Sequence, residues 1–266
     1  MDTVFVGGRP RLAVAVAGAG PLVLFLHGIG GNRGSWAPQL PEFARRYRAA
    51  AWDARGYGES DDYDGPLDFA DFAADVARVL DHFGERRAHL VGLSMGGRIA
   101  RDFALRRPER VATLTLANTS PGFDALSAEA VQAFIEARRA PLAAGKTPRD
   151  IAPELARRLV GSRAQPEALE ALAESLAALR ADSYLKTLEA SVAQDRAAPL
   201  ERLAVPTLVV TSDEDRLYPP ALAREMARRI PGAELVELAG AGHVSNLEQP
   251  DAFNRAVLDF LARRGG

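Results

Sequence analysis

Short apolar runs alternate along the chain with longer segments that have the period of an α-helix. The apolar runs predict eight β-strands, at residues 3–6, 12–16, 22–26, 49–52, 88–91, 111–117, 207–211 and 235–238. The third run, LVLFL, is wholly apolar, which is typical of a strand covered on both faces. The first two runs flank the turn sequence GGRPR and predict an antiparallel hairpin.

Helical periodicity fills most of the intervals between these runs. In residues 68–86 the apolar side chains fall on one face, and Gly84 supplies the stop signal. A similar stripe near the end of the chain is formed by Phe253, Val257, Leu258 and Leu261. Strands that alternate with helices predict an α/β fold, with a mostly parallel eight-stranded sheet and helices on both of its faces.

Residues 123–198 break this alternation. They contain no run typical of a strand, are rich in Ala, Leu, Glu and Arg, and are punctuated by prolines, which predicts four or five helices. We therefore expect a core made of residues 1–122 and 199–266, into which residues 123–198 are inserted as a helical cap.

Composition and charge narrow the class of partner. Of the 266 residues, 47% are hydrophobic and 26% charged, as in ordinary globular proteins, and the formal net charge is −2. So small a net charge does not attract the protein to nucleic acid or to an anionic membrane. The absence of cysteine excludes disulfides, thiolate catalysis and Cys-ligated zinc. The N-terminal apolar runs are too short for a signal peptide or a membrane helix, so we expect a cytoplasmic protein that acts on a small molecule.

The stretch GLSMG at residues 92–96 matches the pattern G-x-S-x-G. A predicted strand precedes it directly, and a helical segment follows and ends at Pro108. This context indicates a nucleophile elbow, in which Ser94 stands on a sharp turn at the edge of the sheet. The flanking glycines allow the close approach of neighbouring chain, and the helix N-terminus directs its free amides towards the reacting atom.

A serine nucleophile requires a base, and the chain holds four histidines. His243 lies in a glycine-containing loop after the last predicted strand, and reactive groups collect at that edge of a parallel sheet. His82 lies near the end of a helix, His89 opens a strand, and His27 precedes a glycine-rich loop that it is expected to brace. His243 is therefore the predicted base.

Three acidic residues are candidates to orient that base. Asp213, Glu214 and Asp215 follow the strand at residues 207–211, and spacing does not choose among them. An acidic loop after a strand is also ordinary turn chemistry. The chain order Ser, acid, His is nevertheless the one expected for this type of sheet.

Five ordered segments, LHGIGG, DARGYGES, GLSMGG, DEDRLYPP and GAGHVSNLEQP, resemble the signature segments of α/β-hydrolases. The resemblance covers nearly the whole chain outside the predicted cap. It implies that Ser94 is the nucleophile, His243 the base and Asp215 the orienting acid, and that the backbone amides of Ile29 and Met95 form an oxyanion hole. It further implies acyl transfer that calls for no metal or organic cofactor, and it identifies DARGYGES as a structural turn.

Within this family the chain resembles the 3-oxoadipate enol-lactonases in the stretches that contain Ser94 and His243, although its HGIGGN loop has the generic hydrolase form. The expected substrate is a carboxylic ester or lactone. Haloalkane dehalogenases and epoxide hydrolases carry aspartate at the position of Ser94, which disfavours their chemistry here. Two alternatives keep the same triad: a carbon–carbon bond hydrolase or perhydrolase, and a ligand sensor that signals through its cap.

The predicted cap carries an excess of basic residues. Between residues 138 and 163 two acidic side chains, Asp150 and Glu154, stand against seven basic ones: Arg138, Arg139, Lys146, Arg149, Arg157, Arg158 and Arg163. One interpretation is that some of them face the site and attract an anionic acid; the other is a solvated helical surface. The expected pocket residues are Trp36, Leu217 and Val244.

Overall fold

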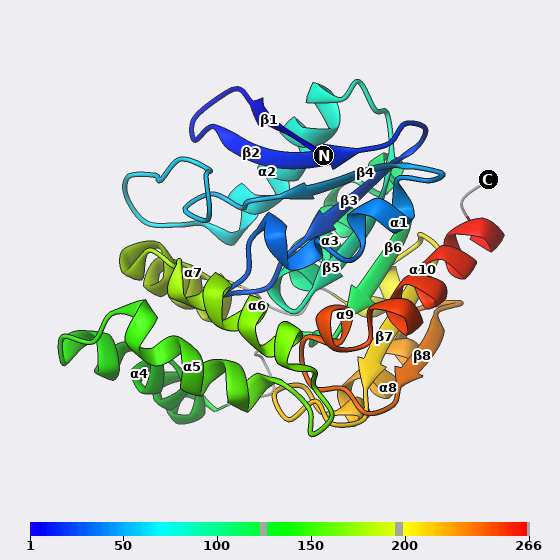
Figure 1. The fold of residues 1–266 in the computed structure, drawn as a ribbon. Coiled ribbons are helices and arrows are strands. Elements are labelled where there is room, and N and C mark those ends of the chain that lie inside the picture. Colours follow the sequence, from blue (N-terminus) through cyan, green and yellow to red (C-terminus); the bar gives the residue numbers. More distant parts are fainter. Residues whose placement is uncertain (123–126, 195–198, 265–266) are drawn as a thin grey trace.

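The computed structural model describes residues 1–122, 127–194 and 199–264, and all eight predicted strands are present. They form one sheet in the order β1-β2-β4-β3-β5-β6-β7-β8 (Figure 1). The strands are β1 (Asp2–Val6), β2 (Leu12–Ala17), β3 (Leu22–Leu26), β4 (Arg48–Trp52), β5 (Ala88–Leu93), β6 (Val111–Ala117), β7 (Thr207–Ser212) and β8 (Glu234–Leu238).

The sheet is mostly parallel, as predicted. β2 pairs antiparallel with both β1 and β4, and the pairs from β3 to β8 are all parallel. β1 and β2 form the predicted hairpin, in full register from Asp2 opposite Val16 to Val6 opposite Leu12. The carboxyl ends of the parallel strands therefore lie at a common edge, where the loops that carry the candidate catalytic residues begin.

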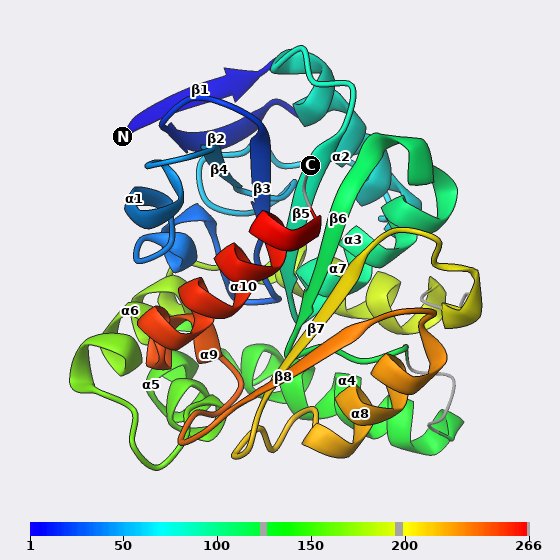
Figure 2. The same ribbon diagram turned by 90° about the vertical axis from the view of Figure 1, so that its right-hand side faces the viewer.

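Helices cover both faces of this sheet, which explains why the central strands are apolar throughout. In β3, Leu24 belongs to the apolar core under α2 (Phe69–His82), α3 (Met95–Arg106) and α8 (Pro220–Arg229). Its neighbour Phe25 belongs to the core under α1 (Leu40–Phe43) and α10 (Pro250–Arg264) (Figure 2). Successive side chains of a strand point to opposite faces, so each face requires its own apolar residues.

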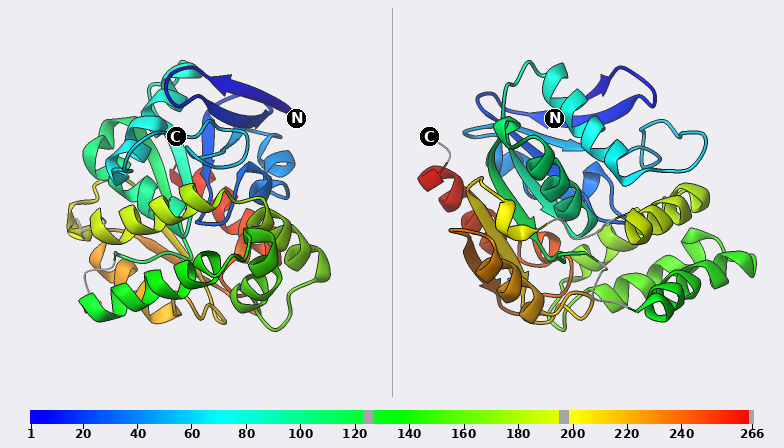
Figure 3. Two further views of the ribbon diagram at one scale, coloured as in Figure 1. Left: turned by 90° about the vertical axis from the view of Figure 1, so that its left-hand side faces the viewer. Right: turned by 180° about the vertical axis from the view of Figure 1, so that it is seen from behind.

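Four described helices fill the stretch between β6 and β7 where the sequence predicts no strand: α4 (Ala128–Ala143), α5 (Pro148–Leu159), α6 (Pro166–Ala177) and α7 (Ala181–Gln194). They lie together at one end of the sheet (Figures 1 and 3), with α5 packed on α6 and α4 on α7. We call α4–α7 the cap helices. The predicted limits of the cap, residues 123 and 198, lie outside the described residues.

Four short helical segments complete the described chain: η1 (Arg33–Trp36), η2 (Pro108–Arg110), η3 (Leu200–Arg202) and α9 (Ser245–Glu248). A search of the described helices finds none with both the length and the apolar character that crossing a membrane requires.

Candidate active site

Ser94 stands on the sharp turn between β5 and α3. Its backbone has φ 55° and ψ −117°, a left-handed conformation that a residue with a side chain rarely adopts. A Cβ on Gly96 would lie 2.0 Å from the carbonyl oxygen of Leu26, so only glycine fits there. Thr119 holds the turn by donating its hydroxyl to the Ser94 carbonyl oxygen, at 2.6 Å. The turn therefore presents the Ser94 side chain at the edge of the sheet.

His243 and Asp215 form a hydrogen-bonded pair. The distance from His243 Nδ1 to Asp215 Oδ2 is 3.0 Å, and because an ionised carboxylate only accepts, Nδ1 carries the proton and Nε2 has a free lone pair. Ser94 and His243 line the same two cavities, of about 60 and 30 Å³. All three residues are buried, with exposures of 8% for Ser94, 5% for His243 and 3% for Asp215.

The Asp215 carboxylate is held by donors on both of its oxygens. Oδ1 accepts the backbone amides of Leu217 and Tyr218 at 2.9 Å each, and Oδ2 also accepts the Asn118 side-chain amide at 3.1 Å. Burial alone would raise the pKa of Asp215, but the hydrogen bonds from His243, Tyr218 and Asn118 outweigh it and leave that pKa below its ordinary value. Asp215 is therefore ionised at neutral pH.

The two neighbouring acids have other partners. Asp213 accepts the backbone amide of Gly240 at 2.7 Å, in the loop after β8. Glu214 accepts the amide and the hydroxyl of Ser162, between α5 and α6, at 2.6 and 2.7 Å. Of the three acids that spacing left open, Asp215 is thus the one that the structure places against the histidine.

Asn118 is a site residue that the sequence analysis missed. It follows β6 with φ 43°, and its side-chain amide donates to Asp215 and, at 2.7 Å, to the Ser212 hydroxyl. Its carbonyl oxygen accepts the Ser245 hydroxyl at 2.5 Å. The polar residues that follow β6 in the stretch ANTS are the signal that could have found it, since they leave an apolar strand at the reactive edge.

Glu248 is a second residue that the sequence analysis missed. Its buried carboxylate accepts the backbone amides of Gly161 at 2.7 Å, Gly242 at 3.0 Å and Val244 at 3.3 Å. Burial raises the pKa of Glu248 even though these amides favour the ionised form. The carboxylate thus ties the loop on either side of His243 to the connection between α5 and α6.

The loop after β3 passes directly against the candidate nucleophile. A Cβ on Gly28 would lie 3.0 Å from Ser94 Cβ, and Ile29 lines both cavities that contain Ser94. Within the described ranges the backbone amides of Ile29 and Met95 donate no hydrogen bond. Met95 is the first residue of α3, where helical amides lack an internal partner.

His27 braces this loop, as the sequence analysis expects. Its Nδ1 donates to the Gly28 carbonyl oxygen at 2.8 Å, and its Nε2 accepts the Ala54 amide at 3.0 Å. This pattern requires the neutral imidazole, and burial lowers the pKa of His27 accordingly.

His89 and Asp53 also have structural contacts. His89 Nδ1 lies 2.9 Å from the Thr113 hydroxyl on the neighbouring strand, and burial lowers its pKa to about 4. Asp53, in the DARGYGES segment, accepts the backbone amides of Arg33 at 2.7 Å and Glu59 at 2.8 Å, which closes that turn.

None of the described residues forms a cluster of three or more His, Cys, Asp or Glu suited to a metal ion.

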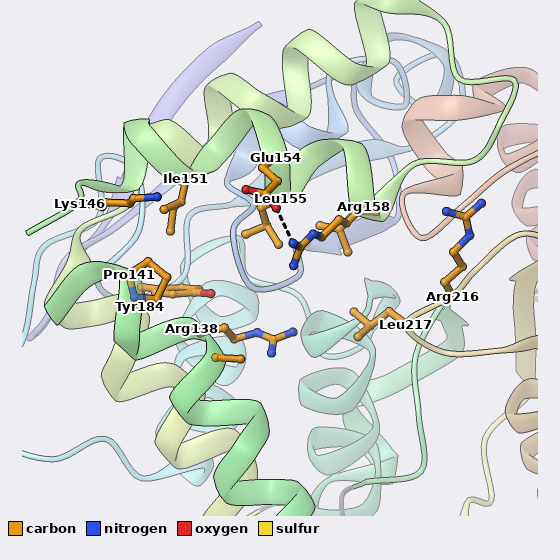
Figure 4. Close-up of a pocket in the computed structure, with 12 residues that line it drawn as sticks. Arg138, Pro141, Lys146, Ile151, Glu154, Leu155, Arg158, Tyr184, Arg216 and Leu217 are labelled. Atoms are coloured by element: carbon orange, nitrogen blue, oxygen red, sulfur yellow. Dashed lines mark hydrogen bonds and ion pairs between the residues drawn. The ribbon is translucent and has the colours of Figure 1, made fainter. Parts of the chain in front are cut away.

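The three expected pocket residues all border cavities. Leu217 lines the 60 Å³ cavity, and Trp36 and Val244 line the 30 Å³ cavity. Trp36 is also fully buried in the core, with its ring centroid 5.0 Å from that of Phe25. The 60 Å³ cavity, which we call the inner cavity, adjoins an outer cavity of about 400 Å³ between the cap helices and the loop after β7 (Figure 4).

Basic side chains surround the outer cavity. Its lining includes Arg138, Lys146 and Arg158 from residues 128–194, together with Arg216, which the sequence analysis did not consider, and one acid, Glu154, which pairs with Arg158. Arg139 is not among the lining residues and pairs instead with Glu189.

Comparison with known proteins places these observations in a family. Residues 21–250 match the model of the family described as "alpha/beta hydrolase fold". The chain is 33% identical to the "Putative carbamate hydrolase RutD" of Azorhizobium caulinodans, with 96% of each chain covered, and 30% identical to the 3-oxoadipate enol-lactonase 2 of Acinetobacter baylyi, covering 91% of this chain and 89% of that one. A malate-bound thermophilic esterase from Thermogutta terrifontis superposes over the full length of both chains with a TM-score of 0.90 and 29% identity.

Proposed function

Since the chain belongs to the α/β-hydrolase family and is a hydrolase, we propose that it cleaves a carboxylic ester or a lactone through an acyl-enzyme on Ser94. The observation that carries this proposal is the buried Asp215–His243 pair, whose histidine lines the same cavities as a serine on a strained strand–helix turn. In the proposed reaction, Ser94 Oγ attacks the substrate carbonyl while His243 Nε2 takes its proton.

Asp215 then stabilises the imidazolium and fixes the tautomer with the proton on Nδ1. The amides of Ile29 and Met95 receive the developing oxyanion, and such a donor is typically worth about 3 kcal/mol. His243 returns the proton to the leaving oxygen, and water attacks the acyl-enzyme in the second half of the reaction. The product is a carboxylic acid.

The names of the relatives support a carbonyl substrate and leave its class to experiment. One is named as an enol-lactonase, one structural relative as an esterase, and one as a carbamate hydrolase. A substrate panel should therefore contain p-nitrophenyl butyrate, a set of lactones and p-nitrophenyl carbamate. The carbon–carbon hydrolase and perhydrolase alternatives use the same triad, and a vinylogous diketone and a peracid assay complete the panel.

The decisive experiment compares wild type with Ser94→Ala in turnover of p-nitrophenyl butyrate and in labelling by a fluorophosphonate probe. Ser120→Ala is a matched control, because Ser120 is another buried serine that follows a strand of the same sheet. We expect Ser94→Ala to lose at least about 10³-fold in turnover and all labelling, and the control to keep both. Turnover or labelling that survives in Ser94→Ala would refute the proposal. Labelling without multiple turnovers on any substrate would favour the ligand sensor.

A further inference from the structure

Arg138 on α4 lines both the inner and the outer cavity. It is half-buried, and Figure 4 shows its guanidinium group directed into the cavity from the helix. Its Nη1 donates to the Phe134 carbonyl oxygen of its own helix at 2.9 Å, and its guanidinium carbon lies 3.5 Å from the centroid of the Phe134 ring. Tyr184 lines both cavities beside it. These contacts hold the group in place.

The positive charge of Arg138 has no carboxylate partner within the ranges that the structure describes. The adjacent Arg139 pairs with Glu189, and Arg158 pairs with Glu154. Burial lowers the pKa of Arg138, which reflects the cost of this charge in its surroundings. Arginine nevertheless remains protonated at neutral pH, so the cavity wall carries an uncompensated cation.

Most of the side chains between Arg138 and the candidate nucleophile are apolar. The inner cavity that contains Ser94, His243 and Arg138 is also lined by the buried Arg98, whose Nη1 donates to the Ser191 carbonyl oxygen at 3.3 Å, and otherwise mainly by leucine and aromatic side chains, including Leu155, Leu159, Leu176, Leu188 and Leu217. A substrate that fits these surroundings has a carbonyl at one end, a short hydrocarbon segment, and an anion at the other.

We propose that Arg138 binds a free carboxylate of the substrate, so that the protein selects esters or lactones that carry a second, anionic group. This inference rests on the proposed function and adds a substrate class to it. The planar guanidinium matches a carboxylate, and the two form charge-assisted hydrogen bonds. Lys146 and Arg216, which line the outer cavity, add positive charge along the approach to this site.

The test compares matched pairs of esters that differ only in charge. For a carboxylate on the acyl side the pair is mono-p-nitrophenyl adipate and its methyl ester. For a carboxylate on the leaving group it is para-acetoxybenzoate and its methyl ester. We expect wild type to prefer the anionic member of at least one pair, and that pair identifies the side of the substrate that Arg138 contacts.

The variants are Arg138→Met, which keeps much of the side-chain volume, Arg138→Lys, which keeps the charge, and Arg139→Met as the matched control from the next position. Arg138→Met should lower kcat/KM for the anionic ester about 10- to 100-fold and change that for the neutral ester less than about threefold. Arg138→Lys should keep part of the preference, and Arg139→Met all of it. An equal loss on both esters, or a wild type without preference for either anionic ester, would overturn the inference.

A binding measurement separates this inference from the proposed reaction. Adipate should raise the melting temperature of wild type and of Arg139→Met but not that of Arg138→Met, because ligand binding stabilises the folded state by mass action. If wild type hydrolyses neither the four esters nor the esters and lactones of the substrate panel, the proposed function is refuted, and the adipate shift alone decides whether Arg138 binds carboxylates. Equal shifts in wild type and Arg138→Met would refute the carboxylate site even if hydrolysis were confirmed.

Discussion

The Glu248 carboxylate offers the sharpest test of how the loop around His243 is held. It accepts three buried amides, those of Gly161, Gly242 and Val244, and two of these belong to the residues on either side of His243. Glu248→Ala leaves these donors without their partner. Glu248→Gln keeps one acceptor oxygen and turns an NH₂ group towards the remaining amides. The alanine variant should therefore be the more severely affected of the two.

The size of the effect follows from these contacts. A buried donor that loses its partner costs about 1–3 kcal/mol, so three of them set an upper range of several kcal/mol. Part of this is offset, because burial raises the pKa of Glu248 and removing the ionised carboxylate also removes its cost at neutral pH. We expect Glu248→Ala to lose about 2–4 kcal/mol, which for a chain of 266 residues corresponds to a melting temperature roughly 4–7 °C lower.

Activity provides a readout that a purely structural role would not change in the same way. A small displacement of His243 weakens proton transfer more than it alters the cavities that His243 lines, so kcat for p-nitrophenyl butyrate should fall about tenfold or more, with a smaller change in KM. The control is Glu237→Gln, which removes a surface ion pair with Arg224 and should cost less than about 1 kcal/mol. The reasoning is refuted if Glu248→Ala melts within about 1 °C of wild type, or if its loss appears in KM alone.

Three further predictions concern the loop beside the nucleophile, a buried histidine and the support of the orienting acid. Gly28→Ala places a methyl group 3.0 Å from Ser94 Cβ and should lower kcat at least about tenfold, whereas Gly7→Ala, which meets no atom within 4 Å, should have no effect; equal activities would contradict the geometry. The pKa of His89 is lowered to about 4, so its contribution to stability is present above the unfolded value of 6.5 and is lost as the pH falls towards 4. Between pH 6.5 and 4 the unfolding free energy of His89→Phe should therefore fall by up to about 3 kcal/mol less than that of wild type, and denaturant titrations at several pH values measure this difference. Asn118→Asp replaces an amide donor with a second carboxylate beside the orienting acid and should reduce kcat at least about tenfold; an unchanged kcat would show that this contact is dispensable.

The strands could be predicted from the sequence because each is a short apolar run bounded by turn residues. The predicted ends differ from the observed ones by at most two residues: β5, for example, continues to Leu93 and thus reaches the elbow serine. Helix α8 was not predicted. Its sequence, PALAREMARR, is only ten residues long and carries four charged side chains, and only Ala223 and Met226 of this helix are buried, so its apolar stripe is short.

The elbow and the base could be inferred from the sequence because their signals are local, whereas the acid and the supporting residues depend on distant contacts. Asp213, Glu214 and Asp215 are equivalent by spacing, and they differ in their partners, which come from the loop after β8 and from the cap. The same holds for Asn118, whose role depends on strands that are brought together only by the fold. Spacing alone does not distinguish these carboxylates, and the polar stretch after β6 marks the position of Asn118 without showing that its amide contacts Asp215.

The orientation of the cap arginines shows a similar limit. Arg138 and Arg139 are adjacent in the sequence, yet one lines the cavities and the other pairs with Glu189. α4 has no fully buried residue, so no apolar stripe reveals which of its faces meets the core. The excess of basic residues could therefore be recognised from the sequence, but the member that faces the site could not.

The end of α5 contacts both the loop that carries the base and the cavity of the proposed substrate site. The His243 amide donates to the Leu159 carbonyl oxygen at 2.7 Å, and Leu159 is the last residue of α5. A Cβ on Gly161 would lie 2.8 Å from the Gly242 nitrogen, so the two backbones are in direct contact. Leu159 also lines the inner and outer cavities. The end of α5 is thus part of the substrate wall and also supports the base. A displacement of this segment therefore changes the shape of the cavity and the position of His243 together. Substrates that differ in how they contact this wall should accordingly differ in kcat as well as in KM.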